Sequence, residues 1–97
     1  MQFPSYSTHP QLNYHHKAAL EAVVPPRKAT VNSNHRWFYS LAENDKAWRP
    51  VRNVVADFCN QLIQTQGYSK REAKTYAKSV VQTYMLQFQI ANYGLIT

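Results

Sequence analysis

The sequence contains little glycine, little cysteine, few acids and no long apolar run. Only two of its 97 residues are glycine and one, Cys59, is cysteine. Sparse glycine and the lack of alternating apolar and polar residues disfavour β-strands, so the sequence predicts an all-α protein. A lone cysteine excludes an intrachain disulfide, and no basic-then-apolar leader is present, so we expect a cytoplasmic protein. No apolar run approaches the roughly 18 residues of a membrane span, and we expect no membrane partner.

Residues that carry catalysis or bind metals are scarce and are not suitably spaced. The chain has five acidic residues and four histidines, none of them in a C-x-x-C, H-x-x-x-H or H-E-x-x-H pattern. A glycine-rich phosphate loop is also missing. Cys59 follows Phe58 on an apolar helical face, where a small buried side chain is expected. We therefore expect a protein that is not an enzyme and has no metal and no cofactor.

What the chain does have is enough apolar residues for one small core and an excess of positive charge. Apolar residues make up 44% of the chain, and the formal net charge is +6. The length suits a single helical domain, which we place at residues 10–97 after an N-terminal arm at residues 1–9. The charge favours nucleic acid or an acidic protein surface as the partner.

Helix start and stop signals predict a small bundle of about four helices. The first should begin at Pro10 and end before Pro25, with one face formed by Leu12, His16, Ala19, Leu20 and Val23. A short second helix should run from a cap at residues 32–34 through residue 44. Pro50 should open the third helix, at residues 50–66, which ends at Gly67. The side chains expected on the apolar face of the third helix are Val51, Val54, Val55, Phe58 and Leu62.

The fourth predicted helix, residues 69–93, has the strongest local signal. Ser69 and Glu72 form an S-x-x-E capping box at its start. We expect a buried stripe along this helix, formed by Ala73, Tyr76, Ala77, Val80, Tyr84, Phe88 and Ala91. A polar flank should contain Arg71, Lys74, Lys78, Gln82 and Gln89, and an uncharged segment further along should leave Leu86, Ile90 and Tyr93 outside both.

The third and fourth predicted helices, joined by a turn with glycine, resemble a helix-turn-helix in local pattern. An ordinary antiparallel αα-hairpin with a basic face fits the same residues. In a helix-turn-helix, the start of the fourth predicted helix would enter the DNA major groove. The residues that would bind nucleic acid or an acidic partner are Ser69, Lys70, Arg71, Lys74 and Lys78, with support from Arg49 and Arg52.

Two functional hypotheses follow from these patterns. The first is a small DNA-binding protein, with the uncharged segment from Met85 to Ile96 pairing two copies into a dimer. The second is an inhibitor or adaptor, of the kind carried by phages and mobile elements, that binds a host nuclease or defence complex. Its protein interface would use the apolar anchors Tyr39, Leu86, Ile90 and Tyr93.

Overall fold

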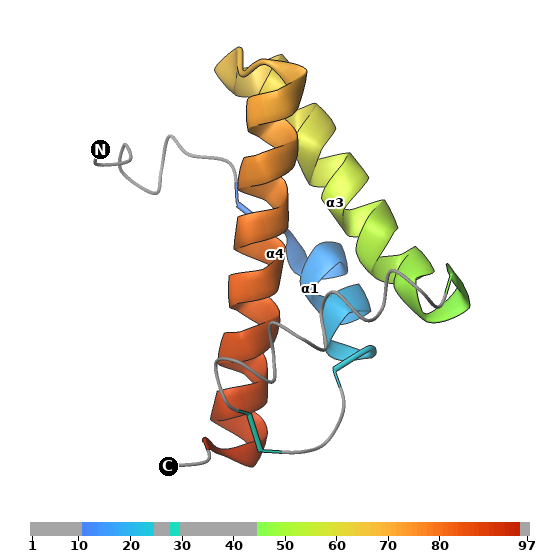
Figure 1. Cartoon of the computed structure of the whole chain (residues 1–97), viewed down its shortest axis with the longest axis vertical. Coiled ribbons are helices and arrows are strands. Elements are labelled where there is room, and N and C mark those ends of the chain that lie inside the picture. The colour runs from blue at the N-terminus through green and yellow to red at the C-terminus, as the bar shows by residue number, and fades with distance from the viewer. Residues whose placement is uncertain (1–10, 25–27, 30–44, 96–97) are drawn as a thin grey trace.

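The structure, a computed structural model, describes residues 11–24, 28–29 and 45–95 of the chain (Figure 1). Within these residues it contains α1 (Tyr14–Glu21), α3 (Asp45–Gln66) and α4 (Lys70–Tyr93). The described segments form no strand beyond an isolated bridge between Ala29 and Leu95. The all-α prediction is therefore confirmed for this part of the chain, whereas the predicted second helix and the arm at residues 1–9 lie outside it.

The two long helices are arranged as a hairpin with the short helix inside its opening. α3 and α4 run antiparallel from the turn that joins them, and α1 lies between their separated ends (Figure 1). Each of the three helices contacts the other two. The antiparallel course of α3 and α4 matches the αα-hairpin that the sequence left open beside a helix-turn-helix (Figure 1). None of the described helices combines the length and the apolar character that crossing a bilayer would take.

α1 begins four residues later than Pro10, where the sequence predicted its start. Asn13 is the N-cap, and its side-chain oxygen accepts the backbone N–H of His16 at 2.8 Å. Asparagine is among the best N-cap residues because its short side chain reaches the free N–H groups of the first turn. Of the side chains predicted on one face of this helix, Leu12, His16 and Leu20 are buried, and Ala19 and Val23 are half-buried.

α3 begins five residues earlier than predicted, at Asp45, so that Pro50 lies inside the helix. Proline fits the first turn best, which is why its position predicted the start. Within the helix it has no N–H to donate to the carbonyl of Lys46, at the cost of one backbone hydrogen bond. The apolar face beyond Pro50 matches the prediction, and each of its side chains is at most 7% exposed; they are Val51, Val54, Val55, Phe58 and Leu62.

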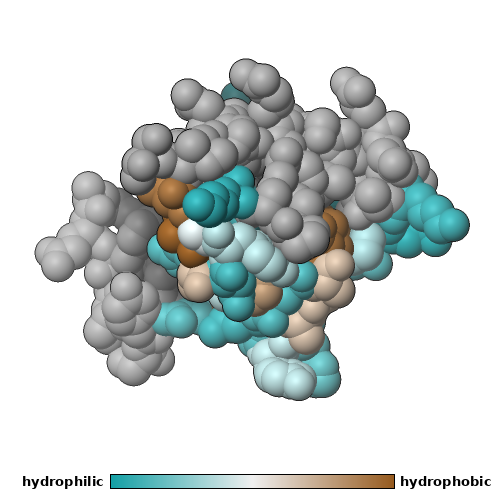
Figure 2. Space-filling model, turned by 90° about the horizontal axis from the view of Figure 1, so that it is seen from below, coloured by the Kyte–Doolittle hydropathy of each residue, from teal (hydrophilic) through white to brown (hydrophobic). Residues whose placement is uncertain are grey.

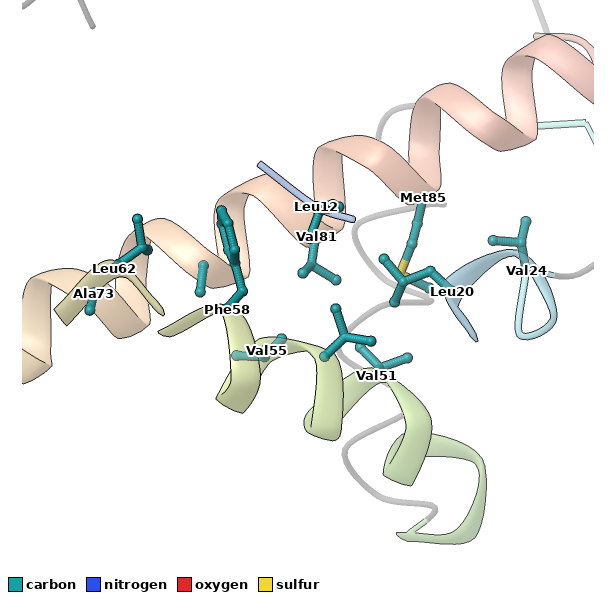
Figure 3. Close-up of a cluster of buried hydrophobic side chains, with 12 residues drawn as sticks. Leu12, Leu20, Val24, Val51, Val55, Phe58, Leu62, Ala73, Val81 and Met85 are labelled. Atoms are coloured by element: carbon teal, nitrogen blue, oxygen red, sulfur yellow. The ribbon is translucent and has the colours of Figure 1, made fainter. Parts of the chain in front are cut away.

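The core runs along the inside of the hairpin and changes partner halfway along α4. Figure 3 shows Ala73 beside Leu62 of α3, and Met85 beside Leu20 of α1. The buried side chains of α4 are Ala73, Ala77, Val81, Met85 and Gln89. The predicted stripe is correct only at Ala73 and Ala77, because Tyr76, Val80, Tyr84 and Phe88 are half-buried and Ala91 is exposed.

This error has a geometric cause. Residues four apart advance by about 40° around a helix, so a stripe at 73, 77, 81, 85 and 89 winds around α4. A winding stripe suits a helix that contacts α3 along its first half and α1 along its second. Gln89, predicted on the polar flank, is consequently only 1% exposed.

The turn between α3 and α4 depends on two residues that the sequence identified. Gly67 has a φ of 68°, in the left-handed region that glycine adopts without strain, and its N–H donates to the carbonyl of Ile63 at 3.2 Å. Ser69 then caps α4: its hydroxyl oxygen accepts the N–H of Glu72, and the Glu72 carboxylate accepts the N–H of Ser69, both at 3.2 Å. The predicted capping box is confirmed.

Candidate functional site

Four basic side chains form a strip on the first half of α4. We call Lys70, Arg71, Lys74 and Lys78 the basic strip; all four are exposed. At about 100° per residue they lie within an arc of about 100° around the helix. With a rise of about 1.5 Å per residue, the three lysines are spaced about 6 Å apart along a line of about 12 Å. The structure thus brings together the four cations that the sequence predicted to act together.

The capping box that starts α4 keeps Glu72, the acid closest to the strip in sequence, away from the strip residues. Glu72 lies about 160° around the helix from Lys74, so it projects from the opposite side. Its carboxylate accepts hydrogen bonds from Ser69, and these hold the pKa of Glu72 below its usual value of 4.5. Ser69, which we expected to contact the partner, therefore acts in this structure as the N-cap of α4.

Every carboxylate whose side chain the structure describes is engaged away from the basic strip. Glu72 is bound by Ser69, Asp57 by His16, and Glu21 by the hydroxyl of Tyr84. Among these side chains, none forms an ion pair with a strip residue. The strip is therefore an uncompensated cluster of positive charge within the described part of the molecule.

Arg49 and Arg52, predicted to support the strip, lie at the other end of the hairpin. Both are exposed on α3. Arg52 precedes the last residue of that helix, Gln66, by 14 positions, or about 21 Å along the axis. The expectation that they join Lys70 and Arg71 in one site is not met, because the third predicted helix is long and antiparallel to α4.

Arg49 instead lines a shallow groove of about 440 Å³ between α1 and α3. The groove also contains a buried histidine paired with an acid: His16 Nε2 lies 2.5 Å from Asp57 Oδ2. His16 Nδ1 accepts the backbone N–H of Asn13 at 3.4 Å, so Nε2 carries the proton that is donated to Asp57. Because both ring nitrogens are occupied, this imidazole is not placed to act as a general base.

A second polar cluster attaches α1 to α4. The hydroxyl of Tyr84 donates a hydrogen bond to Glu21, and the Lys17 ammonium lies 5.8 Å from the centre of the Tyr84 ring. Burial, followed by the hydrogen bond and the negative charge of Glu21, raises the pKa of Tyr84 to about 12. Sequence reasoning missed both this cluster and the His16 pair. His16 was nevertheless placed on an apolar face, and a buried imidazole needs a partner.

The residues predicted as a protein interface are only partly observed. Leu86 and Ile90 are half-buried on α4, and Tyr93 is 37% exposed. Tyr39 lies outside the described residues. Viewed from the end of the molecule where α4 finishes, the coloured surface shows small apolar patches separated by hydrophilic ones (Figure 2).

A comparison of the chain with protein-family models found no match, and comparisons with curated proteins and with solved structures also found none.

Proposed function

We propose that this chain is a nucleic-acid-binding protein without catalytic activity, and that the basic strip of α4 contacts the phosphate backbone. The observation that carries this proposal is the arrangement of charge. Four exposed cations share one face of a helix, while the described carboxylates Glu21, Asp57 and Glu72 are all engaged elsewhere. Backbone phosphates form the densest array of negative charge that such a face commonly meets.

Two further features support an anionic partner at this position. The strip occupies the first turns of α4, at the positive end of the helix dipole. The net charge of +6 would also speed the encounter with a polyanion. The strip follows the side of α4, so the helix would lie along a phosphate backbone rather than enter a groove with its tip.

The test is to replace all four strip residues by glutamine. Glutamine has a helix propensity close to that of lysine and arginine, so α4 should persist, as far-ultraviolet circular dichroism would verify. Binding to a labelled oligonucleotide, followed by fluorescence anisotropy at low salt, should weaken at least tenfold because the phosphate contacts are lost. Lys46→Gln is the matched control, since Lys46 is an exposed cation at the opposite end of α3. Equal binding by the fourfold variant and the wild type would refute the proposal.

An inhibitor or adaptor is a second candidate, and the uncharged end of α4 favours it. Leu86, Ile90 and Tyr93 fall within about 60° of one another around the helix and could form apolar anchors beside a basic strip that fits an acidic protein. A stoichiometric protein complex that survives nuclease treatment and is lost on Ile90→Asp would favour this candidate. A complex that depends on nucleic acid would argue against it.

A further inference from the structure

The aromatic side chains closest in sequence to the basic strip are used for internal packing. Tyr68 and Tyr76 are half-buried, and their ring centres lie 5.9 Å apart in an edge-to-face contact. Tyr76 also lies 6.2 Å from the ring of Phe58, which is fully buried in the core. Both rings therefore contribute part of their surface to internal packing, which leaves less of it available for an unpaired base.

The availability of aromatic rings for stacking matters because proteins bind single strands and duplexes in different ways. Proteins that bind single strands combine a basic groove with aromatic rings on which the bases stack, worth about 1–3 kcal/mol per base. Within the described residues, no exposed aromatic ring accompanies the four cations of the strip, and a surface of this kind gains most binding energy from the ligand with the highest charge density. Duplex DNA carries one charge per about 1.7 Å of axis, twice the density of one of its strands, so the roughly 12 Å of duplex beside the strip carries about seven charges in total on its two strands.

The rigidity of the strip favours the same ligand. Lys70, Lys74 and Lys78 follow one side of a helix that is held by its capping box and by the buried side chains of Ala73 and Ala77. Their fixed spacing, with a rise of about 6 Å and a rotation of about 40° between successive lysines, matches a stiff array of phosphates more closely than a flexible chain, which would lose conformational entropy on binding.

From these observations we propose that the basic strip binds the phosphate backbone of double-helical nucleic acid in preference to single strands. This inference rests on the proposed function and specifies its ligand. Contact is made with phosphates, so duplex RNA and duplex DNA carry the same recognised chemistry. Four phosphate contacts predict that the logarithm of the association constant falls with the logarithm of salt concentration with a slope of about −3.6.

The experiment compares a labelled 20-base-pair duplex with a single strand of the same length, by fluorescence anisotropy between 50 and 200 mM salt. We expect the duplex to bind at least tenfold more tightly than the single strand at 50 mM salt. Single-strand binding that equals or exceeds duplex binding would overturn this inference while leaving nucleic-acid binding intact. Failure of both ligands to bind would instead defeat the proposed function on which the inference depends.

Two variants separate phosphate contact from base stacking. Lys74→Gln should reduce the magnitude of the duplex salt slope by about 0.9, because one contact is removed, whereas Lys46→Gln should leave the slope unchanged. Tyr68→Leu keeps an apolar side chain at the turn and should leave the preference for duplex unchanged. A selective loss of single-strand binding in Tyr68→Leu would show that this ring stacks on bases, against the inference.

Discussion

Replacing Gly67 by alanine tests whether the turn between α3 and α4 depends on a left-handed backbone. Gly67 has a φ of 68°, and a Cβ atom built there would meet no atom within 4 Å. The substitution therefore introduces no clash, and its cost is conformational. A non-glycine residue in this region costs about 1–2 kcal/mol, partly offset by about 0.4–1 kcal/mol because alanine restricts the unfolded chain.

The expected net effect is a loss of about 1 kcal/mol in the free energy of unfolding. Urea denaturation followed by circular dichroism should show a lower midpoint with an unchanged slope, because the surface exposed on unfolding stays the same. In a chain of this size the melting temperature should fall by roughly 4–8 °C. Gly67→Asn should lose less, since asparagine tolerates the left-handed region better than alanine does.

A control for this series is Gln64→Ala, an exposed position one turn earlier on α3. A surface change of this kind should alter the free energy of unfolding by no more than about 0.5 kcal/mol. If Gly67→Ala were as stable as the wild type or more stable, the turn would not require a positive φ. The close approach of the two helices at this end would then need another explanation.

Two other predictions concern hydrogen bonds with a pH signature. The pKa of Tyr84 is raised to about 12 in the folded protein, so its contribution to stability is complete below pH 10 and is lost between pH 10 and about 12. Urea titrations across that range should show a smaller loss for Tyr84→Phe than for the wild type. Ser69→Ala should lower the free energy of unfolding by about 0.5–2 kcal/mol through loss of the N-cap. Because the pKa of Glu72 lies below 4.5, the stability from the capping box is present above pH 4.5 and lost as pH falls through the lowered pKa. Ser69→Ala should reduce that acid loss, and an unchanged acid profile would contradict the assignment.

Features decided by a few neighbouring residues could be predicted from the sequence. The capping box of Ser69 and Glu72, and the positive φ of Gly67, depend on backbone geometry within one turn. The buried face of α3 is also local, because Phe58 and Leu62 stay on one side of a helix with a single main partner. Pro50 misled the prediction of the helix start, because proline favours the first turn of a helix whereas α3 begins five residues earlier, at Asp45.

In the candidate site, too, the features set by local sequence could be predicted and those set by tertiary packing could not. The strip residues lie within nine positions of one helix, so their shared face follows from helical geometry alone. The placement of Arg49 and Arg52 depends on the length and direction of α3 relative to α4. The pairing of His16 with Asp57 joins positions 41 residues apart, which no local pattern specifies.

The asymmetry of α4, charged at its start and uncharged towards its end, follows from how the bundle packs. Numbered from Lys70 at about 100° per residue, the basic strip spans the sector from about 0° to 100°. Val81, Met85 and Gln89, all buried in the second half, occupy that same sector. This sector of α4 is therefore exposed in the first half, where the helix packs against α3, and buried in the second half, where α1 packs against it. Lysine and arginine are tolerated on that side only in the first half, because a buried unpaired charge would be strongly destabilising in the second. Packing therefore explains why charge is absent from the buried sector of the second half, but it does not require four cations in the exposed sector. That excess is the feature for which binding to a polyanion supplies a reason.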